Sequence, residues 1–116
     1  MEGEILKGHL DMILLAALAA RPAYGYAIFQ EIRRRSGNAF DLPEGTIYPA
    51  LHRLEQAGLL SSRWANSETG RKRRIYSVTA RGRRAFADRR AVWHRFANAL
   101  RGLLAEAGHV VTEPHR

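Results

Sequence analysis

The chain has 116 residues, no cysteine and a formal net charge of +8. Its length suits one domain with an appended helix, and the lack of cysteine excludes disulfides, thiolate metal sites and cysteine catalysis. No apolar run is long enough to span a membrane, and the acidic N-terminus lacks the basic start of a signal peptide, so we expect a cytoplasmic protein with no membrane partner. The basic excess is concentrated in residues 63–95, which hold eleven Lys or Arg against two acids. This concentration indicates a polyanionic partner, although an arginine-rich surface alone has the same composition.

Apolar spacing and turn-forming residues predict a mainly α (α+β) fold, a winged helix-turn-helix followed by a C-terminal dimerisation helix. Gly58 is expected to end the third helix as its C′ residue, and Thr79 to cap the N-terminus of the last helix. In chain order, the expected elements are helices at about 5–20, 24–38 and 44–57, strands at 59–65 and 74–78, a last helix at 80–108, and a frayed tail at 109–116. Residues 1–79 then form the DNA-binding domain.

The helix expected at 44–57 has one buried and one polar face. Ile47, Leu51 and Leu54 recur at helical spacing and are expected to face the core. The outward residues combine polar, aromatic and basic side chains, which is typical of a helix that reads DNA. These residues are Thr46, Tyr48, Pro49, His52 and Arg53. Pro49 is expected in the first turn or so, where its missing N–H has little effect.

Residues 66–73 are polar, turn-forming and basic, and they join the two expected strands in a β-hairpin. Side chains alternate along a strand, so half of the basic residues at its tip and return arm can face DNA. Lys72 and either Arg71 or Arg73 are the best candidates for phosphate or minor-groove contact. The alternative is a solvated run of charges.

The last helix carries an apolar seam in which successive residues are seven, three, four, three and four positions apart, from Phe86 to Ala107. This spacing is typical of a coiled coil, and Arg89 interrupts it. With the first helix, this seam is expected to form a dimer. The candidate interface residues are Leu6, Leu10, Phe86, Phe96, Leu100 and Leu103.

Four separated blocks of sequence together resemble the PadR family of bacterial transcriptional regulators. The blocks are Tyr24-Gly25-Tyr26, the run from Gly45 to Leu60 (GTIYPALHRLEQAGLL), Gly70 to Tyr76 (GRKRRIY), and Val78 to Gly82 (VTARG). The likeness covers about residues 5–105 in the family's order, and the single C-terminal helix resembles the smaller subfamily that includes multidrug-sensing repressors.

The resemblance implies a homodimer that binds double-stranded palindromic promoter DNA, usually as a repressor released by a small molecule. It also implies that Trp93, with Arg90 and Ala97 beside it, stacks on a planar aromatic effector between the protomers. The alternative for Trp93 is a dimer-core aromatic without ligand. No carboxylate lies one turn either side of Trp93, so a neutral or anionic effector suits the position better than a cation.

The candidate DNA contacts differ in their expected roles. Arg53 suits bidentate reading of guanine, because Glu55 is not at the spacing that would pair with it inside the helix. Tyr48 suits a phosphate contact with its ring packed on the start of the second helix; the alternative is packing alone, against Tyr24 or Tyr26. The full candidate set is Tyr24, Thr46, Tyr48, Pro49, His52, Arg53, Arg71, Lys72 and Arg73.

Catalytic and metal chemistry have no support in the sequence. The five histidines show no metal-ligand spacing, and no carboxylate pair, phosphate loop or catalytic triad stands out. We therefore expect neither enzyme activity nor a cofactor or metal. Two further functions stay open, a winged-helix module for protein–protein contact and a sequence-independent nucleic-acid binder.

Overall fold

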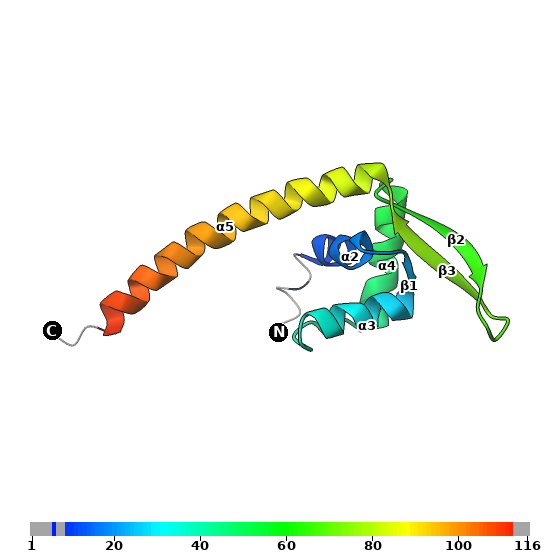
Figure 1. Cartoon of the computed structure of the whole chain (residues 1–116), viewed down its shortest axis with the longest axis horizontal. Coiled ribbons are helices and arrows are strands. Elements are labelled where there is room, and N and C mark those ends of the chain that lie inside the picture. Colours follow the sequence, from blue (N-terminus) through cyan, green and yellow to red (C-terminus); the bar gives the residue numbers. More distant parts are fainter. Residues whose placement is uncertain (1–5, 7–8, 113–116) are drawn as a thin grey trace. The chain divides into compact units, whose positions relative to one another are not determined.

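The computed structural model describes Leu6 and residues 9–112, with side chains up to residue 107. Its elements are α2 (Leu10–Ala19), β1 (Ala23–Tyr24), α3 (Gly25–Arg35), α4 (Glu44–Gln56), β2 (Leu60–Asn66), β3 (Lys72–Val78) and α5 (Ala80–Thr112) (Figure 1). The chain divides into two compact units, residues 1–86 and 87–116. The first unit therefore includes the first turns of α5 as well as the expected DNA-binding domain. No helix in the described part of the chain is long and apolar enough to cross a membrane.

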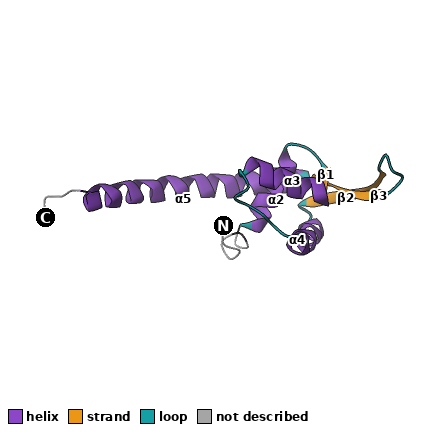
Figure 2. Cartoon of the chain, turned by 90° about the horizontal axis from the view of Figure 1, so that it is seen from below, coloured by secondary structure: helices purple, strands orange, loops and turns teal. Residues whose placement is uncertain are grey.

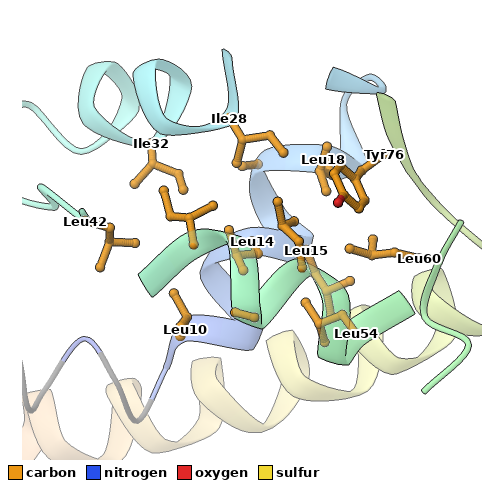
Figure 3. Packing of buried hydrophobic residues seen from close by; sticks show 14 of the residues in the cluster. Leu10, Leu14, Leu15, Leu18, Ile28, Ile32, Leu42, Leu54, Leu60 and Tyr76 are labelled. Atoms are coloured by element: carbon orange, nitrogen blue, oxygen red, sulfur yellow. The ribbon is translucent and has the colours of Figure 1, made fainter. Parts of the chain in front are cut away.

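Aliphatic side chains from α2, α3, α4 and β2 form the core of the first unit (Figure 3). Leu14, Leu15 and Leu51 have no exposed surface, and Ile28 and Ile47 are each 1% exposed. The inward residues expected on the third helix are thus confirmed. Burial of each such side chain contributes about 1.5–3 kcal/mol relative to leaving it in water, so this small core can hold three helices together.

The turn between α3 and α4 departs from helical geometry at two successive residues. Gly37 and Asn38 both have positive φ angles, 61° and 67°. The Asn38 N–H donates to the Arg33 carbonyl at 2.8 Å, and the Phe40 N–H donates to the Ser36 hydroxyl at 3.0 Å. These bonds satisfy backbone groups that the end of α3 leaves free, and they fix the direction in which α4 starts.

A three-stranded antiparallel sheet in the order β1-β3-β2 carries the hairpin. The hairpin projects away from the helices of the first unit (Figures 1 and 2). β3 starts at Lys72, two residues before the expected strand, because Lys72 pairs with Asn66 and Arg73 with Ala65. The sequence does not predict β1, since two residues are too few to show an alternating pattern; they pair with Ile75 and Tyr76.

Both expected end signals around the sheet are confirmed. Gly58 has a φ of 80° at the end of α4, and the Leu59 N–H donates to the Leu54 carbonyl at 3.0 Å. Thr79 Oγ1 accepts the Gly82 N–H at 3.0 Å as the cap of α5, and it donates to the Gly58 carbonyl at 2.7 Å. One threonine thus connects the end of α4 to the start of α5.

Several expected boundaries and contacts need correction. Leu6 and Leu10 are 4% and 7% exposed within the protomer's own core, and Phe86 packs partly buried against that core. Leu6 and Leu10 therefore stabilise the first unit rather than offering a free dimer surface, whereas Phe86 keeps part of its surface exposed and its place in a dimer interface stays a prediction. The helix expected to end at residue 108 continues to Thr112, because a glycine inside a helix costs only about 1 kcal/mol relative to alanine. The start of the helix expected at residue 5 falls on residues outside those described, apart from Leu6.

Candidate nucleic-acid interface

The buried and exposed residues of α4 divide this helix into a core face, an outward line and two flanks. Ile47, Ala50, Leu51 and Leu54 are buried. The exposed residues opposite them follow one another at four-, three- and four-residue spacing, which keeps them on one face of a helix. They are Gly45, Pro49, His52 and Gln56. This outward line is the part of α4 best placed to enter a DNA groove.

Pro49 is the sixth residue of α4, so it lies in the second turn and not the first. The Gly45 carbonyl consequently has no N–H four residues further on. Because Gly45 carries no side chain and an added Cβ there would meet nothing within 4 Å, the outward line leaves open space at its N-terminal end. A nucleic acid can approach the backbone closely at this point.

One flank of α4 carries Tyr48 and faces the start of α3. A Cβ added at Gly25 would lie 2.5 Å from the Tyr48 hydroxyl oxygen, so the tyrosine ring packs directly on the Gly25 backbone. The expected packing on the start of the second helix is therefore confirmed. Tyr48 is still 45% exposed, so part of this residue faces solvent; a contact between its hydroxyl and a phosphate stays a prediction.

The opposite flank carries Thr46, which is half-buried, and Arg53. The Arg53 guanidinium donates to the Asp11 carboxylate of α2 and forms an ion pair with it. Spacing along the sequence tests only for a partner inside the same helix, whereas the observed partner lies 42 residues away. Arg53 is thus directed toward α2, although its side chain remains 57% exposed, and its expected contact with guanine stays a prediction.

The basic residues of the hairpin are not equivalent. Arg71 and Lys72 are exposed at its outer end. Arg73 is half-buried, with its guanidinium carbon 4.2 Å from the centroid of the Tyr24 ring, which places Tyr24 under a cation. Arg74 forms an ion pair with Glu55 of α4 at 3.5 Å. Arg71 and Lys72 therefore remain the most available for phosphates.

Glu55 connects α4 to the hairpin. The Ser62 hydroxyl of β2 donates to Glu55 Oε2 at 2.5 Å, and the same oxygen is 3.5 Å from the Arg74 guanidinium. Beneath this network the Tyr76 side chain is buried, and burial raises the pKa of its hydroxyl above the ordinary value near 10. Tyr76 is consequently neutral at the base of the hairpin.

The residues expected to bind an effector all lie on α5, in the second compact unit. Trp93 is 39% exposed, and its ring centroid is 5.6 Å from that of Phe96 at a tilt of 37°. Arg90 is exposed and Ala97 is half-buried. Three of the residues expected at the dimer interface, Phe96, Leu100 and Leu103, are also exposed in this unit, at 54%, 39% and 69%.

Two exposed residues of α4 and the hairpin lie outside the expected set of DNA contacts. Gln56 completes the outward line of α4, and its spacing from Pro49 and His52 is the sequence signal that identifies it. Trp64 of β2 is 62% exposed beside Arg74; its position depends on strand register, which the sequence does not give. Within the described residues no cluster of His, Asp or Glu could hold a metal ion.

The helix-turn-helix, the basic hairpin and the outward line together define a winged-helix DNA-binding protein. The family described as the transcriptional regulator PadR-like family matches residues 14–88, so the chain belongs to the PadR family. It is 35% identical over 107 residues to the transcriptional regulator Rv3488 of Mycobacterium tuberculosis, a match that covers 91% of this chain and 96% of the relative.

Solved structures agree with this membership. A PadR family transcription regulator from Clostridium difficile superposes with a TM-score of 0.74 at 30% identity, covering 83% of this chain and 98% of that one. A PadR family regulator from Eggerthella lenta gives a TM-score of 0.72 at 34% identity, covering 87% of this chain and 86% of that one. The winged-helix fold is thereby confirmed, and the protein is a DNA-binding transcriptional regulator and not an enzyme.

Proposed function

We propose that this regulator is a ligand-responsive repressor that binds a palindromic promoter site as a homodimer. The observation that carries the proposal is the outward line of α4 next to the exposed basic tip of the hairpin, both in the first compact unit. His52 and Gln56 present hydrogen-bonding groups that suit base edges, and glutamine pairs well with adenine in the major groove. Arg71 and Lys72 then neutralise flanking phosphates.

The apolar surface of α5 supports the homodimer. Six large apolar side chains in the second unit are between 39% and 69% exposed, and a soluble protein rarely leaves such a continuous series in water. They are Val92, Trp93, Phe96, Leu100, Leu103 and Leu104. Their spacing lets the helix pack on a second copy of itself, and two-fold symmetry then matches a palindromic site.

Trp93 supports a response to a ligand. It lies within this exposed series with an aromatic neighbour, so its symmetry mate can approach it in a dimer. A planar aromatic between the two rings would change the separation of the protomers, and hence the spacing of the two reading helices on one operator. The β2–β3 hairpin is the wing of the fold, and its contacts within each protomer would be unaffected.

Footprinting on the DNA adjacent to the protein's own gene tests this function. We expect protection of a two-fold symmetric site whose half-sites are about one helical turn, 10–10.5 base pairs, apart. A double variant, His52→Ala with Gln56→Ala, should lose the footprint but keep weak binding to bulk DNA, since the wing is intact. If bulk DNA competed for the parent protein as well as the operator DNA does, the result would instead support a sequence-independent binder.

A further inference from the structure

A hollow of about 390 Å³ lies where the start of α3, the exposed flank of α4 and the hairpin meet. Three cations line it, Lys72, Arg73 and Arg74, together with the partly exposed aromatic rings of Tyr48 and Trp64. Among its described lining residues there is no carboxylate. The hollow is therefore both positively charged and aromatic, a combination that suits a nucleic-acid backbone better than an apolar ligand.

Trp64 is the most unusual member of this lining. It is 62% exposed, although a tryptophan of this size in a strand ordinarily covers the core. Its cross-strand partner is Arg74, whose guanidinium carbon lies 5.2 Å from the centroid of the indole ring. Glu55 holds the same guanidinium at 3.5 Å, so the arginine is fixed against the ring. Trp64 thus offers an exposed aromatic surface beside a cation that Glu55 positions.

The position of the hollow determines what can reach it. Tyr48 belongs to the reading helix and Trp64 to the hairpin, so a ligand in the hollow contacts both DNA-binding elements at once. A DNA strand that is contacted by both α4 and the hairpin would therefore run past the hollow. Its phosphates seek cations and hydroxyl donors, and its deoxyribose rings have apolar faces that pack on an aromatic ring.

We propose that the hollow seats one deoxyribose-phosphate unit of the bound DNA, with Trp64 against the sugar and Lys72, Arg74 and the Tyr48 hydroxyl around the phosphate. Glu55 acts here as a positioning residue, because it orients Arg74 without reaching the DNA itself. This assignment rests on the proposed DNA binding of α4 and the wing. It adds Trp64 and Arg74 to the residues that contact DNA.

The fluorescence of Trp64 tests the assignment directly. The chain has two tryptophans, so a Trp93→Phe variant reports Trp64 alone. Acrylamide should quench this fluorescence readily in the free protein and several-fold less after a saturating duplex is added. The matched control is Trp64→Phe, in which Trp93 reports; its quenching by acrylamide should not change with DNA.

Affinity measurements separate the sugar contact from the phosphate contact. Trp64→Ala should weaken binding about tenfold without changing the salt dependence, because a sugar contact releases no counterion. Arg74→Gln should weaken binding and also reduce the log–log salt slope by about 0.9, the value for one phosphate that the protein no longer neutralises. Thermal unfolding of each variant checks that it is folded. If Trp64→Ala does not fold, the fluorescence measurement on Trp93→Phe still tests the assignment, because Trp64 is intact in that variant.

The outcomes distinguish this proposal from the proposed function. A duplex that binds while Trp64 stays as accessible as in the free protein would overturn the assignment and leave the repressor function standing. Protection of Trp64 together with an unchanged salt slope in Arg74→Gln would remove Arg74 from the phosphate contact. If the parent protein bound no duplex, both proposals would fall together.

Discussion

The two compact units of this protein differ in how far their aliphatic side chains are buried. In residues 1–86 the leucines of α2 and α4 are buried, and Leu14, Leu15 and Leu51 expose nothing. In residues 87–107 the large apolar residues of α5 remain exposed, up to 69% at Leu103. The first unit buries its aliphatic core within one chain and exposes only aromatic residues such as Tyr48 and Trp64 among its described large hydrophobics, whereas the second has an aliphatic and aromatic helix face that is open to solvent in one chain.

The largest effect on the homodimer is expected where a charge is introduced into the exposed apolar face of α5. Leu100→Asp combined with Leu103→Asp should abolish the homodimer, because burying each unpaired carboxylate costs several kcal/mol. Light scattering should report the mass of one chain. The matched control, Asn98→Asp with Gly102→Asp, adds the same two charges at exposed positions off the seam and should stay dimeric. A stable dimer of the leucine double variant would remove this face from the interface.

A second test contrasts one leucine from each unit. Leu51→Ala should lower the free energy of unfolding by about 2–5 kcal/mol at any protein concentration, because it creates a cavity in a closed core. Leu103→Ala should lower stability by an amount that depends on protein concentration, because this side chain contributes only through association. Urea denaturation at two concentrations of each variant distinguishes these results. A concentration-independent loss for Leu103→Ala would mean that the side chain is buried within one protomer.

The third test concerns the charged end of the first unit. Arg71→Ala with Lys72→Ala should weaken binding to all duplexes similarly and flatten the log–log salt slope by about 0.9 for each phosphate that is no longer neutralised. Fluorescence anisotropy at several salt concentrations measures both quantities. The control pair, Arg33→Ala with Arg34→Ala, removes two cations in the last turn of α3, which belong neither to the outward line nor to the hairpin, and should leave the slope close to the parent value.

Local signals predict much of the first unit. The inward face of α4 follows from the spacing of Ile47, Leu51 and Leu54, and Gly58 and Thr79 are placed by the backbone geometry that helix ends require. These signals depend on neighbours within one or two helical turns. They can therefore be read without any knowledge of tertiary structure.

Other parts depend on contacts between distant segments, and the sequence alone does not specify these. The Arg53–Asp11 ion pair joins residues 42 apart, and it directs the Arg53 side chain toward α2. The Trp64–Arg74 contact requires the register of β2 on β3. Leu6 and Leu10 belong to an apolar stripe that suits a protomer core and a dimer seam equally well, and only the packed structure decides between them.

The smallest expected effect concerns the charge preference at Trp93. Arg90 is exposed on the same helix, and the residues one turn either side of Trp93 include no carboxylate. A planar anion placed between two Trp93 rings should therefore bind about fivefold more tightly than a planar cation of similar size, since an exposed charge about 8 Å away in water attracts the anion and repels the cation by about 0.5 kcal/mol each. Quenching of Trp93 in a Trp64→Phe background measures both affinities.

The dimer variants turn this last measurement into a test of where the ligand lies. Leu100→Asp with Leu103→Asp separates the protomers, so the dye should no longer quench Trp93 if it binds between two rings. The Asn98→Asp and Gly102→Asp control should bind the dye as the parent does, because its added charges lie off the seam. Quenching that persists in the monomer would place the dye on a single helix. No quenching by either dye in the parent would assign Trp93 to the dimer core alone, where its ring packs on Phe96 and the partner.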